Sequence, residues 1–230
     1  MISLLPVGGI GEVSPGDELA DMVLRAVELE DYDVLVVTQK VVSKAEGRLV
    51  PLDADDPQAR RRVILGESVR VLREREGMLI TETRHVFVCA NAGVDLSNVA
   101  AGSAALLPVD PDRSARHIRD AILARTGLHT GVIVSDTFGR TWRNGLTDVA
   151  IGCAGIAAVI DLRGTTDAGG RELAVTQVCI ADELAGAAEL VKGKASGVPV
   201  VVVRGVDRSW FRESSVRAEV VRHPSGDLFR

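Results

Sequence analysis

Short runs of Val and Ile recur along the 230-residue chain, and they constrain its fold more than any other feature. The runs occupy residues 34–37, 86–88, 132–134, 156–160, 175–180 and 200–203. Because such runs are apolar on both faces, each is predicted to form a strand that is covered on both sides of its sheet. Aromatic residues make up only 3% of the chain, so the core must consist mainly of Val, Leu, Ile and Ala.

Between these runs, three segments carry apolar residues at the spacing of one helix face. They occupy residues 19–27, 112–126 and 184–191. Asp112 is the predicted N-cap of the second helix, and Gly127 and Gly193 follow the ends of the second and third. A charged stretch, residues 57–76, is also predicted to form an exposed helix.

Strands and helices alternate irregularly along the chain, so the predicted fold class is α+β, with mixed α/β sheets and flanking helices. No low-complexity linker divides the sequence. We therefore expect a single domain over residues 1–230, with room for two closely joined subdomains.

Composition excludes several classes of function. The net charge is −5 at pH 7, which gives no general attraction for nucleic acid. No apolar stretch approaches the roughly 20 residues that cross a bilayer, and no signal peptide is recognisable. A cytoplasmic protein without a membrane partner is therefore expected. The spacing of its Cys and His residues argues against a zinc or thiolate site.

The segment VIVSDTFGRTWRNG, residues 132–145, has the composition of a binding site. Its apolar run ends abruptly in Asp136 and Thr137, whose oxygens suit Mg²⁺ or Mn²⁺ at the carboxyl end of a strand. Two cations and an indole then suit an anionic group and a planar ring. These residues are Arg140, Arg143 and Trp142. A surface turn with ion pairs is the alternative, but three such features at one strand end favour a site.

The segment ANAGVDLSN, residues 90–98, follows the apolar run at 86–88 and is rich in oxygen-bearing side chains. These side chains are Asn91, Asp95, Ser97 and Asn98. Such a density suits a hard divalent cation. Taken alone, the loop is explained nearly as well by an Asx-rich turn.

Two glycine-containing segments suggest phosphate binding, although neither is a complete motif. The first, LLPVGGIGEVSPGD, has Ser14 followed by Pro15 where a Rossmann fingerprint needs its third glycine. It predicts either a turn whose backbone amides hold phosphate or only a tight turn before a helix. The second, residues 188–196, ends in Gly193 and Lys194 but lacks the first glycine and the Ser or Thr of a Walker loop. It is either a basic loop or a helix C-terminus whose lysines complement the helix dipole.

Lys40 and Lys44 follow the apolar run at 34–37 and lie four residues apart. This spacing suits an anion-binding edge, but lysines at strand ends are often only solvated.

Six longer segments, taken in order, resemble the coenzyme F420:L-glutamate ligase family, also described as F420-0:gamma-glutamyl ligases. The segments are LPVGGIGEVSPGDEL, DVLVVTQKVVSKAEGRLVPL, ANAGVDLSNV, LLPVDPDRSARHIRDAI, VIVSDTFGRTWRNGLTDVAIGCAGI and IADELAGAAELVKGKASGVPVVVVRG. The resemblance extends from about Leu5 to Gly205. Because the segments are long and ordered, it is far more specific than any single loop.

The resemblance implies an enzyme that uses GTP to add L-glutamate, and further γ-linked glutamates, to coenzyme F420-0. It also implies one or two Mg²⁺ or Mn²⁺ ions, K⁺ as a further candidate ion, and an intertwined homodimer. The implied metal ligands are Asp95, Asp136 and Thr137. The implied nucleotide contacts are Ile10, Gly11, Glu12, Val13, Gln39, Lys40, Lys44, Asn98, Lys192, Gly193, Lys194, Ala195, Ser196, Gly197 and Val198.

In the expected chemistry, GTP phosphorylates a carboxylate of the coenzyme and the amine of glutamate then displaces phosphate. The expected catalytic residues are Asp95, Asp136, Lys44 and Arg140. The expected substrate contacts are Arg140, Trp142 and Arg143. A metal-dependent nucleotide hydrolase or phosphotransferase is the alternative function, and a silent nucleotide-binding module is a third.

Two departures from the family pattern are expected to matter. Some relatives carry an acidic residue where this chain has Lys-Gly-Lys-Ala-Ser at 192–196, which affects the ligands of a second metal. Many bacterial relatives continue into a flavin-binding domain, which is not expected within these 230 residues.

Overall fold

A five-stranded mixed sheet forms the centre of the computed structural model, which describes all residues except 54, 98, 100–101, 194–195 and 229–230. The strand order is β1-β12-β2-β8-β9. The strands are β1 (Ser3–Val7), β12 (Val200–Arg204), β2 (Val34–Thr38), β8 (Gly131–Arg140) and β9 (Arg143–Ala154). Only the β2–β8 pair is parallel within this sheet, so both of these strands end at the same edge.

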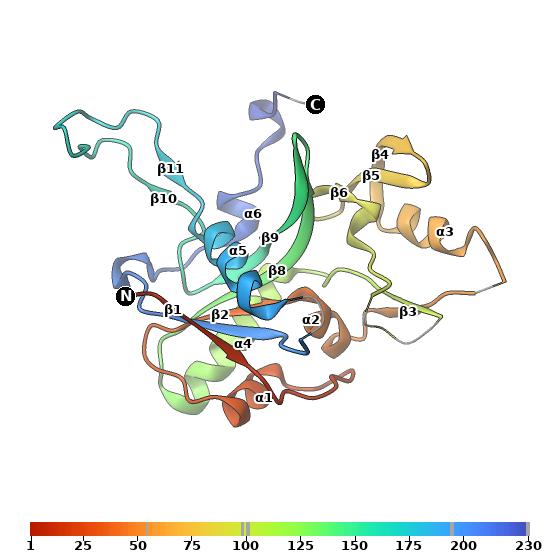
Figure 1. Cartoon of the computed structure of the whole chain (residues 1–230), viewed down its shortest axis with the longest axis horizontal. Coiled ribbons are helices and arrows are strands. Elements are labelled where there is room, and N and C mark those ends of the chain that lie inside the picture. The colour runs from red at the N-terminus through yellow and green to blue at the C-terminus, as the bar shows by residue number, and fades with distance from the viewer. Residues whose placement is uncertain (54, 98, 100–101, 194–195, 229–230) are drawn as a thin grey trace.

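Helices cover both faces of this sheet, as the apolar runs predict (Figure 1). One face packs against α1 (Leu19–Ala26), α2 (Gln39–Ala45) and α4 (Pro111–Thr126). The other face packs against α5 (Ile180–Lys192) and the short α6 (Val216–Glu219). Alternate residues of each strand enter the two cores, because side chains of a strand point to opposite faces.

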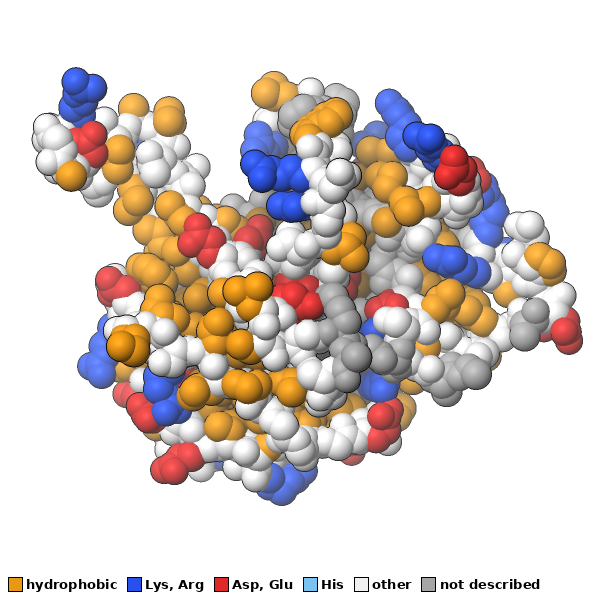
Figure 2. Space-filling model, viewed as in Figure 1, with side chains coloured by type: hydrophobic (Ala, Val, Ile, Leu, Met, Phe, Trp, Pro, Cys, Tyr) orange, Lys and Arg blue, Asp and Glu red, His pale blue; other side chains and the backbone are white. Residues whose placement is uncertain are grey.

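A smaller unit lies beside the end of the central sheet, at the right of Figure 1. It contains β3 (Leu49–Pro51), α3 (Ala59–Gly66), β4 (Ser68–Arg75), β5 (Met78–Thr83), β6 (Val88–Ala90), the 3₁₀ turn η1 (Asn91–Gly93) and β7 (Ser103–Ala105). Its own core is built on Ile64, Leu79 and Leu106. Figure 2 shows Lys and Arg side chains on the outer side of the β4–β5 region.

Two pieces project from the body of the molecule. The β8–β9 hairpin runs past the edge of the sheet, and the arm made by β10 (Ile160–Asp161) and β11 (Gln177–Val178) stands away at the upper left (Figures 1 and 2). The chain after β12 forms two 3₁₀ turns, η2 (Arg208–Trp210) and η3 (Pro224–Gly226). In the part of the chain that the structure describes, no helix combines the length and apolarity needed to span a bilayer.

The predicted α+β class is confirmed, and strands form at three of the six apolar runs as expected. The predicted strand at 156–160 is wrong for most of its length: only Ile160 enters a strand, β10. The backbone amides of this segment instead donate to the C-terminal part of the chain, as Ala157 does to the carbonyl of Trp210 at 2.7 Å. At 175–180 the strand is reduced to β11, and α5 begins at Ile180.

The predicted single helix over 57–76 is also wrong. Its first part forms α3, but residues from Ser68 onward form β4, which pairs with β5. Glu76 and Gly77 both adopt positive φ, the geometry of a two-residue hairpin turn. Pairing with β5 therefore overrides the helix-forming composition of this stretch.

Asp112 does not cap α4, because Asp110 takes that role and accepts a bond from the Arg113 amide at 2.9 Å. Asp112 instead lies buried at the second helical position. Its carboxylate accepts from the amides of Cys153 and Val216, both at 2.8 Å. Asp112, which was expected to cap the start of this helix, thus joins α4, β9 and α6 through hydrogen bonds.

Candidate functional site

Helix α2 presents two lysines at the edge where β2 ends. Lys40 and Lys44 are four residues apart, so they lie on the same side of the helix. The Lys40 ammonium lies 2.7 Å from an Asp95 carboxylate oxygen and 2.8 Å from the Ser97 hydroxyl. The Lys44 ammonium pairs with Glu12, whose side chain is 80% exposed. Both lysines are therefore held at one edge by acidic loops of other parts of the fold.

A cavity of about 330 Å³ lies over this edge. Its lining brings together three separate segments: Gly11, Glu12 and Val13; Thr38, Lys40, Val41 and Lys44; and Gly193, Gly197, Val198 and Pro199. Lysine ammoniums and glycine-rich backbone are the groups that proteins use to bind phosphate. Eight of the fifteen residues that the sequence assigned to nucleotide binding line this cavity.

Asp95 reaches the cavity edge from a backbone of unusual conformation. Asn91, Ala92 and Gly93 all have positive φ, which is uncommon for the first two residue types. Asp95 itself forms two backbone hydrogen bonds with Ala105, at 2.9 and 2.8 Å. Burial works against ionisation of Asp95, yet hydrogen bonds from Lys40 and Ser97 keep its pKa below the ordinary value. Asp95 is therefore an ionised carboxylate at neutral pH.

Asp136 lies on β8, on the same side of the sheet as α2. Burial, together with the negative charges of Asp95 and Asp148, raises the pKa of Asp136 to about 7. The effect of Asp95 confirms that the fold brings these two carboxylates near one another. Asp136 forms no ion pair with a described residue, and the nearby charge of Lys40 only partly offsets the rise in its pKa.

Thr137 points to the other face of β8, because successive side chains of a strand alternate. Its hydroxyl donates to the Asp148 carboxylate at 2.6 Å, and Ser135 donates to the same carboxylate at 3.0 Å. Asp148 lies opposite Thr137 on β9 and is only 3% exposed. The structure thus separates the Thr137 hydroxyl from the Asp136 carboxylate, although the sequence grouped both as metal ligands.

Lys192 also belongs to this buried network. Its ammonium lies 2.6 Å from Asp148, 2.8 Å from the Ser135 hydroxyl and 3.4 Å from the Thr38 hydroxyl. These contacts account for all three of its N–H donors. Lys192 therefore points inward from the end of α5 and does not face the cavity.

Other predicted nucleotide contacts have different surroundings. Gln39 is buried, and its amide oxygen accepts from Ser43 at 2.9 Å. Ile10 is buried in the core, and the Ser196 hydroxyl donates to the Lys192 carbonyl. Asn98, Lys194 and Ala195 lie outside the described residues.

The predicted substrate contacts occupy the tip of the β8–β9 hairpin. Arg140 and Arg143 are exposed and paired across the turn, and Arg140 donates to the Asn144 carbonyl at 2.8 Å. Four residues of extended strand separate Arg140 from Asp136, which is roughly 13 Å. Arg140 is therefore well separated along the strand from Asp136.

Trp142 does not close the core beneath the turn, because it is 82% exposed. Trp142→Ala is therefore expected to change the free energy of unfolding by less than about 0.5 kcal/mol. Trp210→Ala is the matched control, because Trp210 packs against the core and its loss should be clearly destabilising. Urea denaturation followed by circular dichroism measures both, and a large loss for Trp142→Ala would contradict the exposed position.

The donor set at Asp95 and Asp136 fits a hard divalent cation. Among the residues that the structure describes, no three His, Cys, Asp or Glu side chains gather into a complete metal site. Mg²⁺ commonly binds through one or two carboxylates, with phosphate and water oxygens completing its shell. Two neighbouring carboxylates, one of them without a cation partner, meet that requirement beside a phosphate-compatible cavity.

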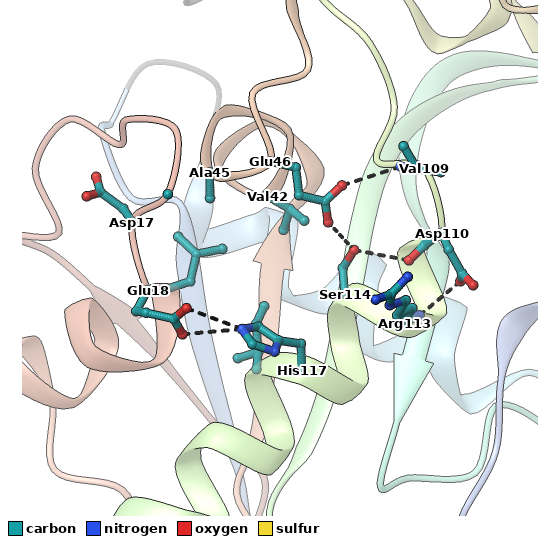
Figure 3. Close-up of a pocket in the computed structure, with 13 residues that line it drawn as sticks. Asp17, Glu18, Val42, Ala45, Glu46, Val109, Asp110, Arg113, Ser114 and His117 are labelled. Atoms are coloured by element: carbon teal, nitrogen blue, oxygen red, sulfur yellow. Dashed lines mark hydrogen bonds and ion pairs between the residues drawn. The ribbon is translucent and has the colours of Figure 1, made fainter.

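A second cavity, of about 350 Å³, lies between α1, α2 and α4 and is shown in Figure 3. Glu18 and Glu46 point into it from opposite sides, and His117 and Ser114 extend toward them from α4. Asp17 and Asp110 add further negative charge to its lining. Carboxylates outnumber cations in this lining, which makes it less suited to phosphate than the cavity beside Lys40 and Lys44.

Asp148 is the polar residue of this region that sequence reasoning missed. It is not part of any local motif, and it becomes adjacent to Ser135 and Thr137 only through pairing of β8 with β9. The sequence did contain one signal. Asp148 begins the segment 148–154, which is otherwise apolar, and a carboxylate buried in such a segment needs a partner.

Together, these features define a mixed α/β protein with a phosphate-compatible cavity, near which two carboxylates, Asp95 and Asp136, repel each other. The sequence model of the family described as F420-0:Gamma-glutamyl ligase matches residues 9–205. The chain is 44% identical to "Coenzyme F420:L-glutamate ligase" of Methanopyrus kandleri, over 95% of this chain and 94% of that protein. It is 41% identical to the proteins of that name from Methanothermobacter thermautotrophicus and Archaeoglobus fulgidus, covering 100% of this chain and 99% and 96% of theirs. The chain belongs to the F420-0:gamma-glutamyl ligase family.

Proposed function

We propose that this protein is a GTP-dependent ligase that joins L-glutamate to coenzyme F420-0 through an amide bond. Membership of the family supports the reaction. The observation that carries the proposal is the cavity lined by Lys40, Lys44 and two glycine-rich segments. Asp95 pairs with the cavity-lining Lys40, and Asp136 is near enough for the charges of both to shift its pKa.

A carboxylate does not react with an amine unless it is activated. The terminal phosphoryl group of GTP passes to the carboxylate of the coenzyme, which gives an acyl phosphate and GDP. The glutamate amine then attacks the acyl carbon, and phosphate leaves. The protein's part in such a transfer is mainly positioning and neutralisation of charge.

The charged side chains of the site each have a part in this scheme. Lys40 and Lys44 exchange their present acidic partners for phosphate oxygens, and the amides of the Gly11 and Gly197 segments hold the remaining oxygens. Asp95 and Asp136 would hold Mg²⁺ or Mn²⁺, which would supply positive charge beside the phosphates. Additional ions, a second divalent cation or K⁺, would depend on ligands from the nucleotide and from the loop after α5.

The hairpin tip binds the anionic part of the coenzyme or the carboxylates of glutamate through Arg140 and Arg143. Trp142 is exposed beside them and offers a face for the deazaflavin ring. The two projecting pieces, the hairpin and the β10–β11 arm, also suit the intertwined homodimer expected for the family.

The direct test incubates the protein with F420-0, L-glutamate, GTP and Mn²⁺, and follows the products by mass spectrometry. The expected products are F420 species heavier by one or more glutamate residues. Omission of glutamate should stop GTP consumption. GTP hydrolysis that continues without glutamate and coenzyme would favour a nucleotide hydrolase, and intact substrate with metal-loaded folded protein would refute the ligase.

Lys44→Met tests the phosphate-binding role of α2. A charged hydrogen bond is worth about 1.5–3 kcal/mol, so the Kd for GTP should rise by roughly 10-fold or more. Isothermal titration calorimetry in the presence of Mg²⁺ measures it. Arg70→Met is the control: Arg70 is exposed on β4 and pairs with Glu82. An unchanged Kd for Lys44→Met would remove Lys44 from the nucleotide site.

A further inference from the structure

A buried ion pair lies directly under the proposed nucleotide cavity, on the face of the sheet opposite Asp136. Lys192 and Asp148 are 2% and 3% exposed, and their charged atoms lie 2.6 Å apart. Glu189 approaches the same ammonium at 3.6 Å. Burial of two charges is costly, and their attraction alone often fails to offset it. Such a pair therefore need not stabilise the fold, and its other contacts must be considered.

The pair contacts three hydroxyls at the place where the parallel pairing of β2 and β8 ends. Thr38 is the last residue of β2, and its register partner Ser135 lies in the middle of β8; both accept from Lys192. Thr137 donates to Asp148. Thr38 also lines the cavity. The network thus fixes the end of β2, from which α2 continues, and the part of β8 that carries Asp136.

The same pair also fixes Gly193, the residue that follows α5. Lys192 is the last residue of α5, and the cavity-lining Gly193 follows it immediately. The Ser196 hydroxyl donates back to the Lys192 carbonyl. A displacement of Lys192 would therefore move a wall of the cavity as well as the end of β2.

We propose that Asp148 and Lys192 are positioning residues, which lock Gly193, the end of β2 and the middle of β8 into the arrangement that binds the nucleotide phosphates. This inference rests on the proposed use of GTP. The two residues act through Thr38, Ser135, Thr137 and Gly193, and their charged groups contact no substrate.

Three variants separate positioning from a purely structural role: Asp148→Asn, Lys192→Met and the double variant. Each single change leaves one buried charge without its partner and should lower Tm. The double change removes both charges and should recover most of the lost Tm. If the pair positions the cavity, the double variant still binds GTP with Mg²⁺ roughly 10-fold or more weakly by calorimetry, and its kcat for glutamate addition stays low by roughly 10²-fold.

A matched control lies at the other end of the same sheet. Arg204 donates two hydrogen bonds to the fully buried Asp33, at 2.9 and 2.8 Å, just before β2 begins. Asp33→Asn should lower Tm without changing the Kd for GTP in the folded protein. The positioning role would be overturned if Asp33→Asn weakened GTP binding as much as the variants of Asp148 and Lys192 do, after correction for the unfolded fraction.

Ser135→Ala serves if the charge variants fail to fold. It removes one contact of each charged partner and leaves both charges in place. Weaker GTP binding at near-normal Tm is expected, and unchanged binding overturns the proposal. Recovery of affinity together with Tm in the double variant also overturns it. If the wild-type protein binds GTP but adds no glutamate, the ligase proposal alone fails; if it binds no GTP, both fail.

Discussion

Replacing Asp136 with Asn is expected to lower the rate of glutamate addition by on the order of 100-fold or more, while the protein remains folded. Asn has nearly the same shape but carries no charge, so it cannot neutralise a cation beside the phosphates. The carboxylate of Asp136 is partly buried, repelled by Asp95 and Asp148, and without an ion-pair partner among the described residues. Its removal should therefore stabilise the metal-free protein at neutral and higher pH.

This combination of lost activity and retained or increased stability distinguishes the prediction from simple unfolding. Rates come from the mass-spectrometric assay at saturating GTP and Mn²⁺, and Tm from differential scanning calorimetry. Asp161→Asn is the control, because Asp161 is exposed on the β10–β11 arm and pairs only locally with Arg163. An Asp136→Asn variant with more than about a tenth of the wild-type rate would exclude Asp136 as an essential metal ligand.

The sequence predicted the elements of the sheet where apolarity and length agreed. The runs at 34–37, 132–134 and 200–203 became β2, β8 and β12 because each is buried on both faces. The run at 156–160 is buried over its first three residues, but its amides bond to the C-terminal segment. An apolar run predicts that a segment is buried, but it does not predict which groups its backbone will hydrogen-bond to.

The candidate site was predicted best where short segments meet at one edge. The segments around Gly11, Lys40 and Gly197 line one cavity, because β2 ends at this edge of the sheet and α5 ends nearby. Sequence could not show side-chain direction. Thr137 was grouped with Asp136 as its neighbour, yet strand alternation places it with Asp148 on the other face.

The inward position of Lys192 was hidden from sequence for the same reason. Its place before a glycine suggested either a basic loop or a helix C-terminus, and Lys192 is indeed the last residue of α5. Its partner Asp148, however, is 44 residues away in the chain. Strand β8 thus has a different arrangement of charges on each of its two faces. On one face, Asp136 has no ion-pair partner among the described residues, and on the other Lys192 and Asp148 neutralise each other.

The elevated pKa of Asp136 predicts that pH and metal jointly control stability. This carboxyl titrates at about 7 in the metal-free folded protein, above its ordinary value of 3.8. Between those values the folded state binds a proton that the unfolded state has released, so the free energy of unfolding falls as pH rises toward 7. Above that pH the destabilisation is fully present. Asp136→Asn should lack this component, so Tm of the variant relative to wild type should increase with pH.

Mg²⁺ should reverse this trend, because the cation binds the ionised carboxylate and must compete with the proton. The increase in Tm produced by a fixed Mg²⁺ concentration should therefore be larger at about pH 8 than at about pH 6. Asp95 keeps a lowered pKa and stays ionised across that range, so the change with pH reports Asp136. The measurement is calorimetric Tm with and without Mg²⁺ at both pH values, for wild type and Asp136→Asn. Equal increments at the two pH values, or the same pH trend in the variant, would show that Asp136 does not bind the cation.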